Sequence, residues 1–204
     1  MKKNLFLIIV LFAFFFSAVN IQSEDFSGKV INFSGLVYVD GKHVSSGMKI
    51  LQGSVIKTDD DTNSQIDILL SADHLIRIKN KSELKIVTVK KTKIKINLLG
   101  GKIFVKAGKS AEDGYFKIYT PTSVTGVRGT KFLVEENNSK TYICVCEGVV
   151  NCFKNTFISR VFGKGKNVKA GYDLWIKSKE DVKEPKHSPQ MAQMTESEFR
   201  EMEQ

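Results

Sequence analysis

Hydrophobic and polar residues alternate along most of the chain, from about residue 30 to residue 175. A period of two is typical of a β-strand with one buried face, and no long stretch here has the period of a helix. Turn residues such as Asp40-Gly41, Gly100-Gly101 and Glu147-Gly148 separate the runs. The pattern therefore predicts an all-β domain of short strands, at residues 24–177. The clearest runs are Ile66–Leu70, Ile76–Lys79, Lys93–Leu98, Lys102–Lys106, Tyr115–Thr120 and Tyr142–Cys146.

Two architectures fit this pattern. One is a short wound β-solenoid, in which strands stack into sheets and the chain turns at glycines. The other is an antiparallel β-sandwich. The chain has no fixed repeat length, so the residues alone leave both open. In either case we expect the core to contain Ile66, Ile68, Ile76, Ile78, Ile94, Ile96, Ile103, Val105, Phe116, Ile118, Phe132 and Val134.

The first residues resemble a secretory leader. Met1-Lys2-Lys3 is positively charged and precedes the apolar run Leu5–Val19. This run is shorter than the roughly 20 residues of a membrane-spanning helix. We therefore expect residues 1–23 to be a signal peptide and the mature protein to be periplasmic or secreted. An uncleaved leader, which would tie the protein to the membrane, is the alternative.

The composition changes after Ile176. Residues 178–204 begin with a charged stretch that holds two prolines, which predicts an extended linker. Thr195 and Glu198 then have the spacing of a capping box, which predicts a short helix through Met202. So short a helix is marginal alone, and we expect a frayed tail rather than a docking element.

One ordered motif lies in the second half of the domain. Pro121 cannot donate to a β-ladder, so it should close the strand before it. Gly126 and Gly129 suit a sharp corner or the close approach of another segment. A second marked step follows at Glu147-Gly148. The motif residues are Thr120, Pro121, Gly126, Val127, Arg128, Gly129, Thr130, Phe132, Glu147 and Gly148.

This order resembles the FecR-type periplasmic domain, whose most recognisable segment reads TP…GVRGT.F.V, followed by EG.V. The similarity extends over roughly residues 28–171 and includes Asn97–Val105 and Val168–Tyr172. The resemblance implies a wound β arrangement and a non-enzymatic binding or sensing module of the cell envelope. It also implies an envelope protein as partner, of unknown identity, and no cofactor.

The iron-uptake regulators of this family also carry a cytoplasmic segment that contacts a sigma factor. Because the apolar run starts so close to Met1, we expect no such segment here. The role in sigma-factor regulation therefore does not carry over from the resemblance.

Arg128 stands out within the motif because a guanidinium between two glycines can reach exposed groups at a corner. We expect it to fasten the corner by binding backbone carbonyls or the carboxylate of Glu147. The alternative is a contact with an anionic ligand.

Lysines give the chain a formal net charge of +9. Lys90, Lys91, Lys93 and Lys95 lie close together and should form one basic face. We interpret this face as solvated, with lysines that discourage edge-to-edge pairing of strands. The alternative function is structural, with the face holding an anionic wall polymer or lipid. No nucleic-acid recognition motif is present, and none is expected outside the cytoplasm.

Three cysteines are an odd number for an oxidising compartment. Cys144 and Cys146 should share one face of a strand, which makes a bridge between them awkward. If the chain turns at Glu147-Gly148, Cys152 comes near one of them. We therefore expect either a disulfide from Cys152 to one of these two, or three buried thiols.

Known catalytic and metal motifs are not found. Asp59–Asn63 lacks the spacing of a calcium loop, and the cysteine spacing is not that of a zinc site. Ser71, Asp73 and His74 can be named as a set, but neighbours in one turn cannot orient one another for nucleophilic catalysis. The sequence thus predicts no enzyme, no metal and no cofactor.

Overall fold

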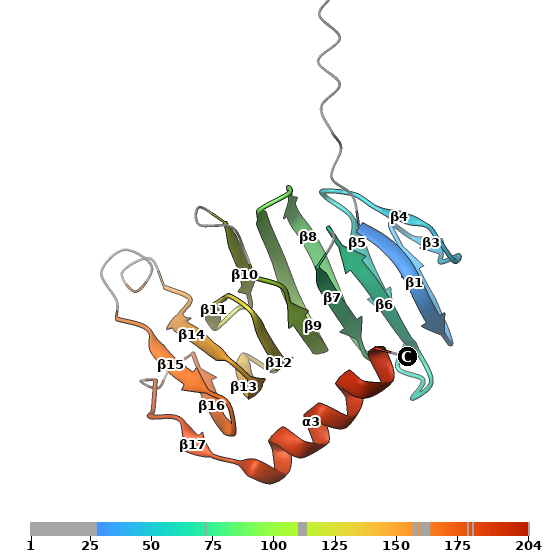
Figure 1. Ribbon diagram of the computed structural model, residues 1–204. Coiled ribbons are helices and arrows are strands. Elements are labelled where there is room, and N and C mark those ends of the chain that lie inside the picture. The colour runs from blue at the N-terminus through green and yellow to red at the C-terminus, as the bar shows by residue number, and fades with distance from the viewer. Residues whose placement is uncertain are drawn as a thin grey trace, which may run out of the picture.

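The computed structural model describes residues 28–71, 73–109, 114–156, 159, 164–178, 180 and 182–203. Hydrogen bonds join seventeen strands into one continuous sheet, which confirms the all-β prediction (Figure 1). The strands are β1 (Gly28–Ser34), β2 (Val37–Val39), β3 (Lys42–His43), β4 (Lys49–Ile50), β5 (Val55–Thr58), β6 (Gln65–Leu70), β7 (His74–Ile78), β8 (Glu83–Val89), β9 (Lys93–Ala107), β10 (Tyr115–Tyr119), β11 (Ser123–Val127), β12 (Thr130–Asn137), β13 (Lys140–Glu147), β14 (Val149–Lys154), β15 (Lys166–Lys169), β16 (Tyr172–Lys177) and β17 (Lys186–His187). The helix α3 (Pro189–Met202) follows them.

The sheet folds into two layers. Layer A has the order β4-β1-β6-β7-β9-β12-β13-β16-β17, and all its neighbours are antiparallel. Layer B has the order β3-β2-β5-β8-β9-β10-β11-β14-β15. Its neighbours are antiparallel except for the parallel pair β9–β10. The first half of the 15-residue strand β9 belongs to layer B and the second half to layer A.

The chain passes between the layers at tight corners. In β9 the crossing occurs at Gly101, which has a φ of +93°. A Cβ atom there would lie 2.1 Å from Ser82 Oγ and 2.6 Å from the Lys81 carbonyl oxygen, so only glycine fits.

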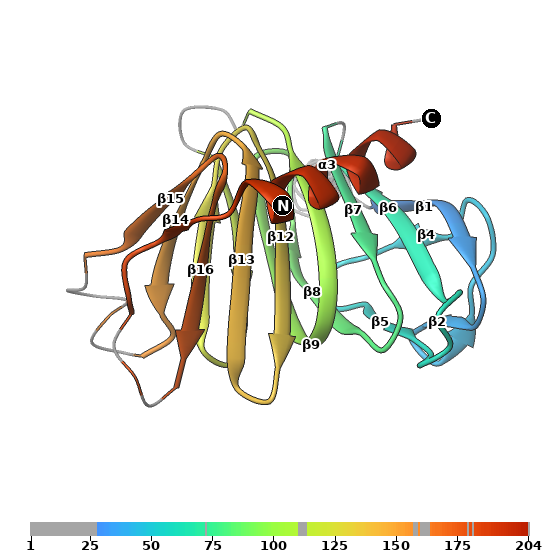
Figure 2. The same cartoon turned by 90° about the horizontal axis from the view of Figure 1, so that it is seen from below.

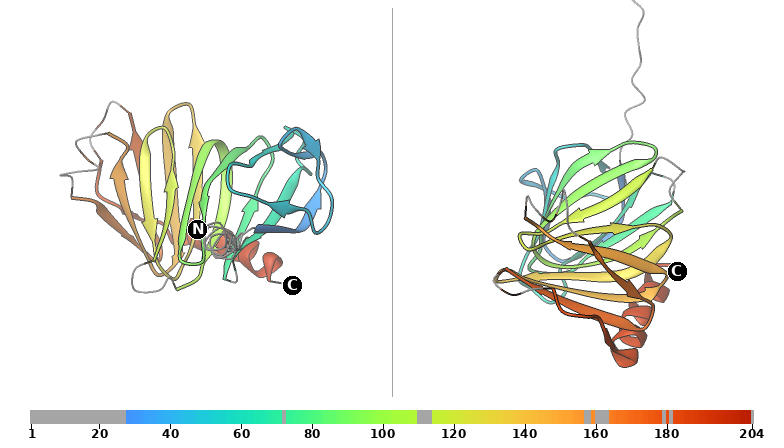
Figure 3. Two further views of the ribbon diagram at one scale, coloured as in Figure 1. Left: turned by 90° about the horizontal axis from the view of Figure 1, so that it is seen from above. Right: turned by 90° about the vertical axis from the view of Figure 1, so that its left-hand side faces the viewer.

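Successive hairpins are added alternately to the two layers. The hairpin β6–β7 lies in layer A, β10–β11 in layer B, β12–β13 in layer A and β14–β15 in layer B (Figure 3). The chain therefore winds along the molecule, as the solenoid-like prediction states, while nearly all its pairings are antiparallel, as in the sandwich alternative.

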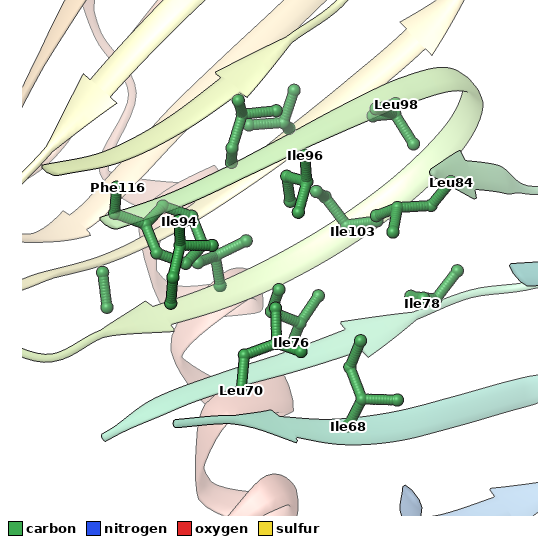
Figure 4. Close-up of a cluster of buried hydrophobic side chains, with 14 of the residues drawn as sticks. Ile68, Leu70, Ile76, Ile78, Leu84, Ile94, Ile96, Leu98, Ile103 and Phe116 are labelled. Carbon is green, nitrogen blue, oxygen red and sulfur yellow. The ribbon is translucent and has the colours of Figure 1, made fainter. Parts of the chain in front are cut away.

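The core lies between the layers. All the predicted core residues are buried there, with exposed fractions of 1% or less. Figure 4 shows Ile68 and Ile76 from layer A in the same apolar cluster as Ile96 and Phe116 from layer B. Because side chains alternate along a strand, the inward positions could be read from the sequence.

The helix α3 covers the outer face of layer A (Figure 2). It begins at Pro189 rather than at Thr195, and Thr195 Oγ1 donates to the Met191 carbonyl within the helix, 2.8 Å away. Thr195 is therefore no N-cap. The expected frayed tail is instead a docked helix, held by a second apolar cluster that includes Phe104, Leu133 and Phe199.

The leader prediction falls on residues 1–23, which lie outside the described residues. Within the part of the chain that is described, no helix combines the length and apolar character that crossing a membrane requires.

Candidate functional site

Two pairs of motif residues, Arg128-Gly129 and Glu147-Gly148, form two stacked corners between the layers. Gly126 forms no corner, because it lies inside β11 without a positive φ and pairs with Lys117 and Asn151. At Arg128-Gly129 the chain passes from β11 in layer B to β12 in layer A, and at Gly148 it returns from β13 to β14. Gly129 has a φ of +62° and Gly148 a φ of +82°. A Cβ on Gly148 would lie 2.8 Å from the Gly129 carbonyl oxygen and 2.7 Å from Thr130 Cγ2. The glycine spacing thus allows two corners to touch through their backbones.

Arg128 does not fasten these corners as expected. Its side chain is exposed, and it makes no hydrogen bond or ion pair with any residue that the structure describes. Glu147 lies 3.7 Å from the Lys131 ammonium instead. The prediction of an Arg128–Glu147 pair is therefore wrong, because backbone conformation and the ladders on both sides already define the corner. Arg128 is left facing solvent.

A buried hydroxyl network closes the core beside Thr120-Pro121. Thr141 Oγ1 donates to Glu136 Oε2 at 2.6 Å. The Thr141 hydroxyl has one hydrogen, so it must accept from Thr120 at 2.6 Å and from Thr122 at 2.5 Å. Ser123 Oγ lies 3.0 Å from Thr120 Oγ1. All five side chains are buried, and together they join the β10–β11 turn in layer B to the β12–β13 hairpin in layer A.

Sequence reasoning found only Thr120 of this network. Glu136 and Thr141 occupy inward positions in strands whose other inward residues, apart from Thr130, are apolar. A polar residue at an inward position is the signal that could have indicated them, because buried polar groups are almost always hydrogen-bonded.

Replacing Thr141 with valine tests the network. The Thr141→Val variant keeps the volume but leaves Glu136 and two threonines without their shared partner, so we expect unfolding to become easier by about 2 kcal/mol. Thr130→Val is the matched control, because the buried Thr130 hydroxyl has no hydrogen-bond partner among the described residues. Its stability should stay the same or rise. Equal losses in urea unfolding of the two variants would contradict a stabilising network.

The predicted basic face lies on the outer side of layer B. Lys93 and Lys95 alternate with buried isoleucines on β9, and Lys90 and Lys91 are exposed in the turn before it. The Nζ atoms of Lys95 and Lys117 lie 5.4 Å and 5.2 Å from the centre of the Tyr115 ring.

Charge on this face is not neutralised locally. Within the described ranges, none of Lys90, Lys91, Lys93 and Lys95 forms an ion pair. On layer A, by contrast, Lys79 pairs with Glu198 of α3, and Lys106 and Lys131 pair with Glu203.

All three cysteines are free thiols, so of the two alternatives the disulfide is wrong and the thiols without a bridge are found, with Cys146 only partly buried. Cys152 points into the core from layer B, whereas Cys144 points outward from layer A toward α3. A layer of β-sheet thus separates the two sulfur atoms. Cys144 and Cys146 share one face of β13, as expected, and Cys146 Sγ donates to the Ala192 carbonyl in α3 at 3.3 Å. Burial raises the pKa of Cys146 and of Cys152 to about 12, so these thiols are poor nucleophiles.

His74 has a structural role, as a hydrogen-bond acceptor and a packed ring. Its Nδ1 accepts a hydrogen bond from the Gly108 amide at 3.1 Å, and its ring packs 5.0 Å from that of Phe116. Burial lowers the pKa of His74, with the nearby Asp73 opposing this shift. An Nδ1 atom that already accepts from the backbone cannot act as a base for Ser71. Among the described residues, no three His, Cys, Asp or Glu side chains gather as a metal site would require.

The buried His74 makes stability depend on pH. The unfolded chain binds a proton at its ordinary pKa of about 6.5, while the folded state resists protonation, so stability falls as pH drops below that value. From pH 7.5 to 5.5 we expect His74 to contribute a loss of up to about 1.4 kcal/mol. His74→Asn places its side-chain oxygen near the position of Nδ1 and removes the titration. The stability difference between the two proteins should therefore shrink toward pH 5.5, and a constant difference in urea unfolding would contradict the assignment.

Residues 39–151 match the family described as FecR protein. The chain belongs to the FecR family. The matched region runs from the end of β2 into β14, and it contains both corners, the hydroxyl network and the basic face. The helix α3 lies outside it. No curated protein sequence matches this chain.

Two solved structures have a similar fold. Both are crystal structures of a "putative anti-sigma factor" from Parabacteroides distasonis. The first is 12% identical, with a TM-score of 0.56 over 71% of this chain and 64% of the other. The second is 11% identical, with a TM-score of 0.53 over 66% of this chain and 59% of the other. This chain thus spans slightly less than two thirds of those proteins, and at this identity the likeness concerns the fold alone.

Proposed function

We propose that this FecR-family protein is a non-enzymatic module of the cell envelope that binds a protein partner in a signalling pathway. The observation that carries the proposal is the family match over residues 39–151. The similar fold of proteins described as anti-sigma factors agrees with a regulatory role. The leader-like residues 1–23 support a periplasmic or secreted location.

The chemistry of the described residues also supports binding rather than catalysis. The buried thiols have raised pKa values, and the nitrogen of His74 that faces Gly108 is already engaged. A rigid two-layer body instead offers strand edges and corners for recognition. Arg128 projects into solvent from such a corner, where its guanidinium can form two hydrogen bonds with a carboxylate.

Cross-linking in intact cells tests this function. A tagged copy is cross-linked and purified from the envelope fraction, and attached proteins are identified by mass spectrometry. We expect one membrane or envelope protein, captured less by an Arg128→Ala variant whose melting temperature is unchanged. Recovery of wall or lipid material alone, released by salt, would instead favour a structural role.

A structural role is the second candidate, and the unpaired lysines around Tyr115 favour it. In this alternative the basic face holds an anionic lipid or wall polymer, with no protein partner needed. Each lysine near an anionic surface contributes about 1 kcal/mol.

Vesicle binding separates the two candidates. With vesicles rich in phosphatidylglycerol, Lys93→Gln/Lys95→Gln should bind about 30-fold more weakly than the unaltered chain. The control Lys81→Gln/Lys102→Gln removes the same charge from lysines outside this face that already pair with Asp60 and Glu135. Equal weakening in both double variants would indicate net charge rather than this face.

A further inference from the structure

The helix α3 is held on layer A by apolar anchors on one side. Phe199 is fully buried, and its ring meets Phe104 edge-on with centres 6.0 Å apart. Thr195 and Met202 are buried at the neighbouring helical positions. Anchors three and four residues apart form one face of a helix. They pack on the apolar residues Phe104, Leu133, Tyr142 and Cys144 of the outer side of layer A, which are called the groove below.

Charges flank this groove. Arg77 projects from β7 under the helix and is only 3% exposed. Its Nε and Nη2 atoms bind both oxygens of Asp67 at 2.8 Å and 2.9 Å. The remaining Nη1 atom donates to Glu198 at 3.2 Å and to Glu201 at 3.3 Å, both on α3.

Three lysines of the layer add to this contact. Lys79 lies 3.2 Å from Glu198, Lys106 lies 2.8 Å from Glu203, and Lys131 lies 3.2 Å from Glu203. The sheet thus supplies the cations and the helix supplies the acids. The groove therefore selects an acidic helix over a basic one.

The sequence of α3 suits the groove better than it suits an isolated helix. Its acids gather in the last turns, where the helix dipole disfavours negative charge. Its N-cap residue Ser188 makes no side-chain capping bond, and its first turn has no acidic residue. Fourteen residues with these features form a weak helix alone, so the helix depends on docking.

The groove is larger than its present occupant. A hollow of about 960 Å³ runs beside α3, and its lining is mixed: Leu99, Phe104 and Met194 contribute apolar surface, while polar residues such as Lys102 and Asn138 contribute the rest. Leu99 and Met194 remain 49% and 65% exposed at its edge. A helix with larger apolar side chains on this flank would bury more surface than α3 does.

The groove lies in the part of the chain that matches the FecR family, whereas the helix that occupies it does not. Arg77, Lys79, Phe104, Lys106 and Lys131 all lie within the matched residues 39–151, whereas α3 lies outside them. The receptor surface therefore belongs to the domain, and the helix is attached to it through residues 178–188.

We propose that the outer face of layer A is a docking groove for an acidic amphipathic helix of a partner protein, and that α3 occupies it until such a helix displaces it. The proposal rests on the proposed function in so far as the partner is a protein. A tethered helix competes at an effective concentration in the millimolar range, so α3 limits binding to partners that fit better.

Peptide binding to the full chain tests the groove. The probe is a fluorescent peptide of residues 186–203, followed by anisotropy. The receptor variant is Glu198→Gln/Phe199→Ala/Glu201→Gln, which loosens α3 and leaves the sheet unaltered. We expect the peptide to bind this variant at least about tenfold more tightly than the unaltered chain, because the tethered competitor is weakened.

Two controls make the result specific. A peptide with the same three substitutions should not bind, and adding Lys106→Glu/Lys131→Glu to the loosened chain should weaken binding of the original peptide. Circular dichroism and melting establish that each variant keeps its β structure.

Three outcomes would overturn the proposal. They are no binding to a folded, loosened chain, equal binding of the original and substituted peptides, and dimerisation of the chain through exchanged α3 helices with no free groove. These outcomes leave the proposed function standing, because cross-linking can capture a protein bound through another face.

Discussion

Gly148→Ala should lower the free energy of unfolding by about 3 kcal/mol, or the melting temperature by about 6–12 °C. Two effects add at this position. The φ of +82° is strained for any residue with a side chain, and the new methyl group would lie 2.8 Å from the Gly129 carbonyl oxygen. Neither backbone can move freely, since β12 and β13 pair along their lengths while β11 pairs with β14.

Gly41→Ala is the matched control, because it introduces the same kind of backbone strain without a close contact to another segment. Gly41 has a φ of +76°, but a Cβ there would meet no atom within 4 Å. Only the backbone strain remains, so the loss should be about 1 kcal/mol. Thermal unfolding of both variants measures the difference. Equal losses would mean that the two corners do not restrain each other.

Arg77→Met should destabilise the protein by a similar amount, about 3 kcal/mol in urea unfolding. Asp67 is only 5% exposed, and removing the guanidinium leaves its carboxylate buried without a countercharge. The hydrogen bonds that Arg77 donates to Asp67 outweigh the effect of burial and raise the pKa of Arg77, so the guanidinium stays charged at this site. The variant also removes the main cation under Glu198 and Glu201, so α3 should dock more weakly.

Replacing Asp67, the other member of the ion pair, should lower the free energy of unfolding by less. In Asp67→Leu the guanidinium keeps Glu198 and Glu201, so its charge stays compensated. The double variant Asp67→Leu/Arg77→Met replaces the buried pair with apolar side chains and should recover most of the loss. A double variant as unstable as the sum of the single ones would show that the pair contributes little through its charges.

Much of the fold was predictable because alternation has a local cause. Ile94 and Ile96 point one way and Lys93 and Lys95 the other simply because successive side chains of a strand face opposite sides. The corners at Gly129 and Gly148 could also be predicted, since glycine adopts a positive φ far more readily than residues with a side chain. The family resemblance, carried by the same residues, is confirmed by the match over 39–151.

The partners of individual side chains were less predictable. Arg128 was expected to be bound and is exposed, whereas Arg77 lies in an alternating run that reads as a solvated face and is buried. Cys144 and Cys152 are only eight positions apart, yet the sheet separates them. In each case the outcome depends on a segment distant in sequence, which a local pattern does not contain.

The sequence by itself determined the all-β class, the inward positions of the core and the glycine corners, because each follows from backbone sterics and a period of two. Only the tertiary structure decided which outer face is covered. Residues 178–204 carry too little apolar periodicity to reveal a docked helix, and α3 forms because layer A offers Phe104 and four cations to its anchors and acids. The groove, and the function we infer for it, exist only when these distant segments are brought together.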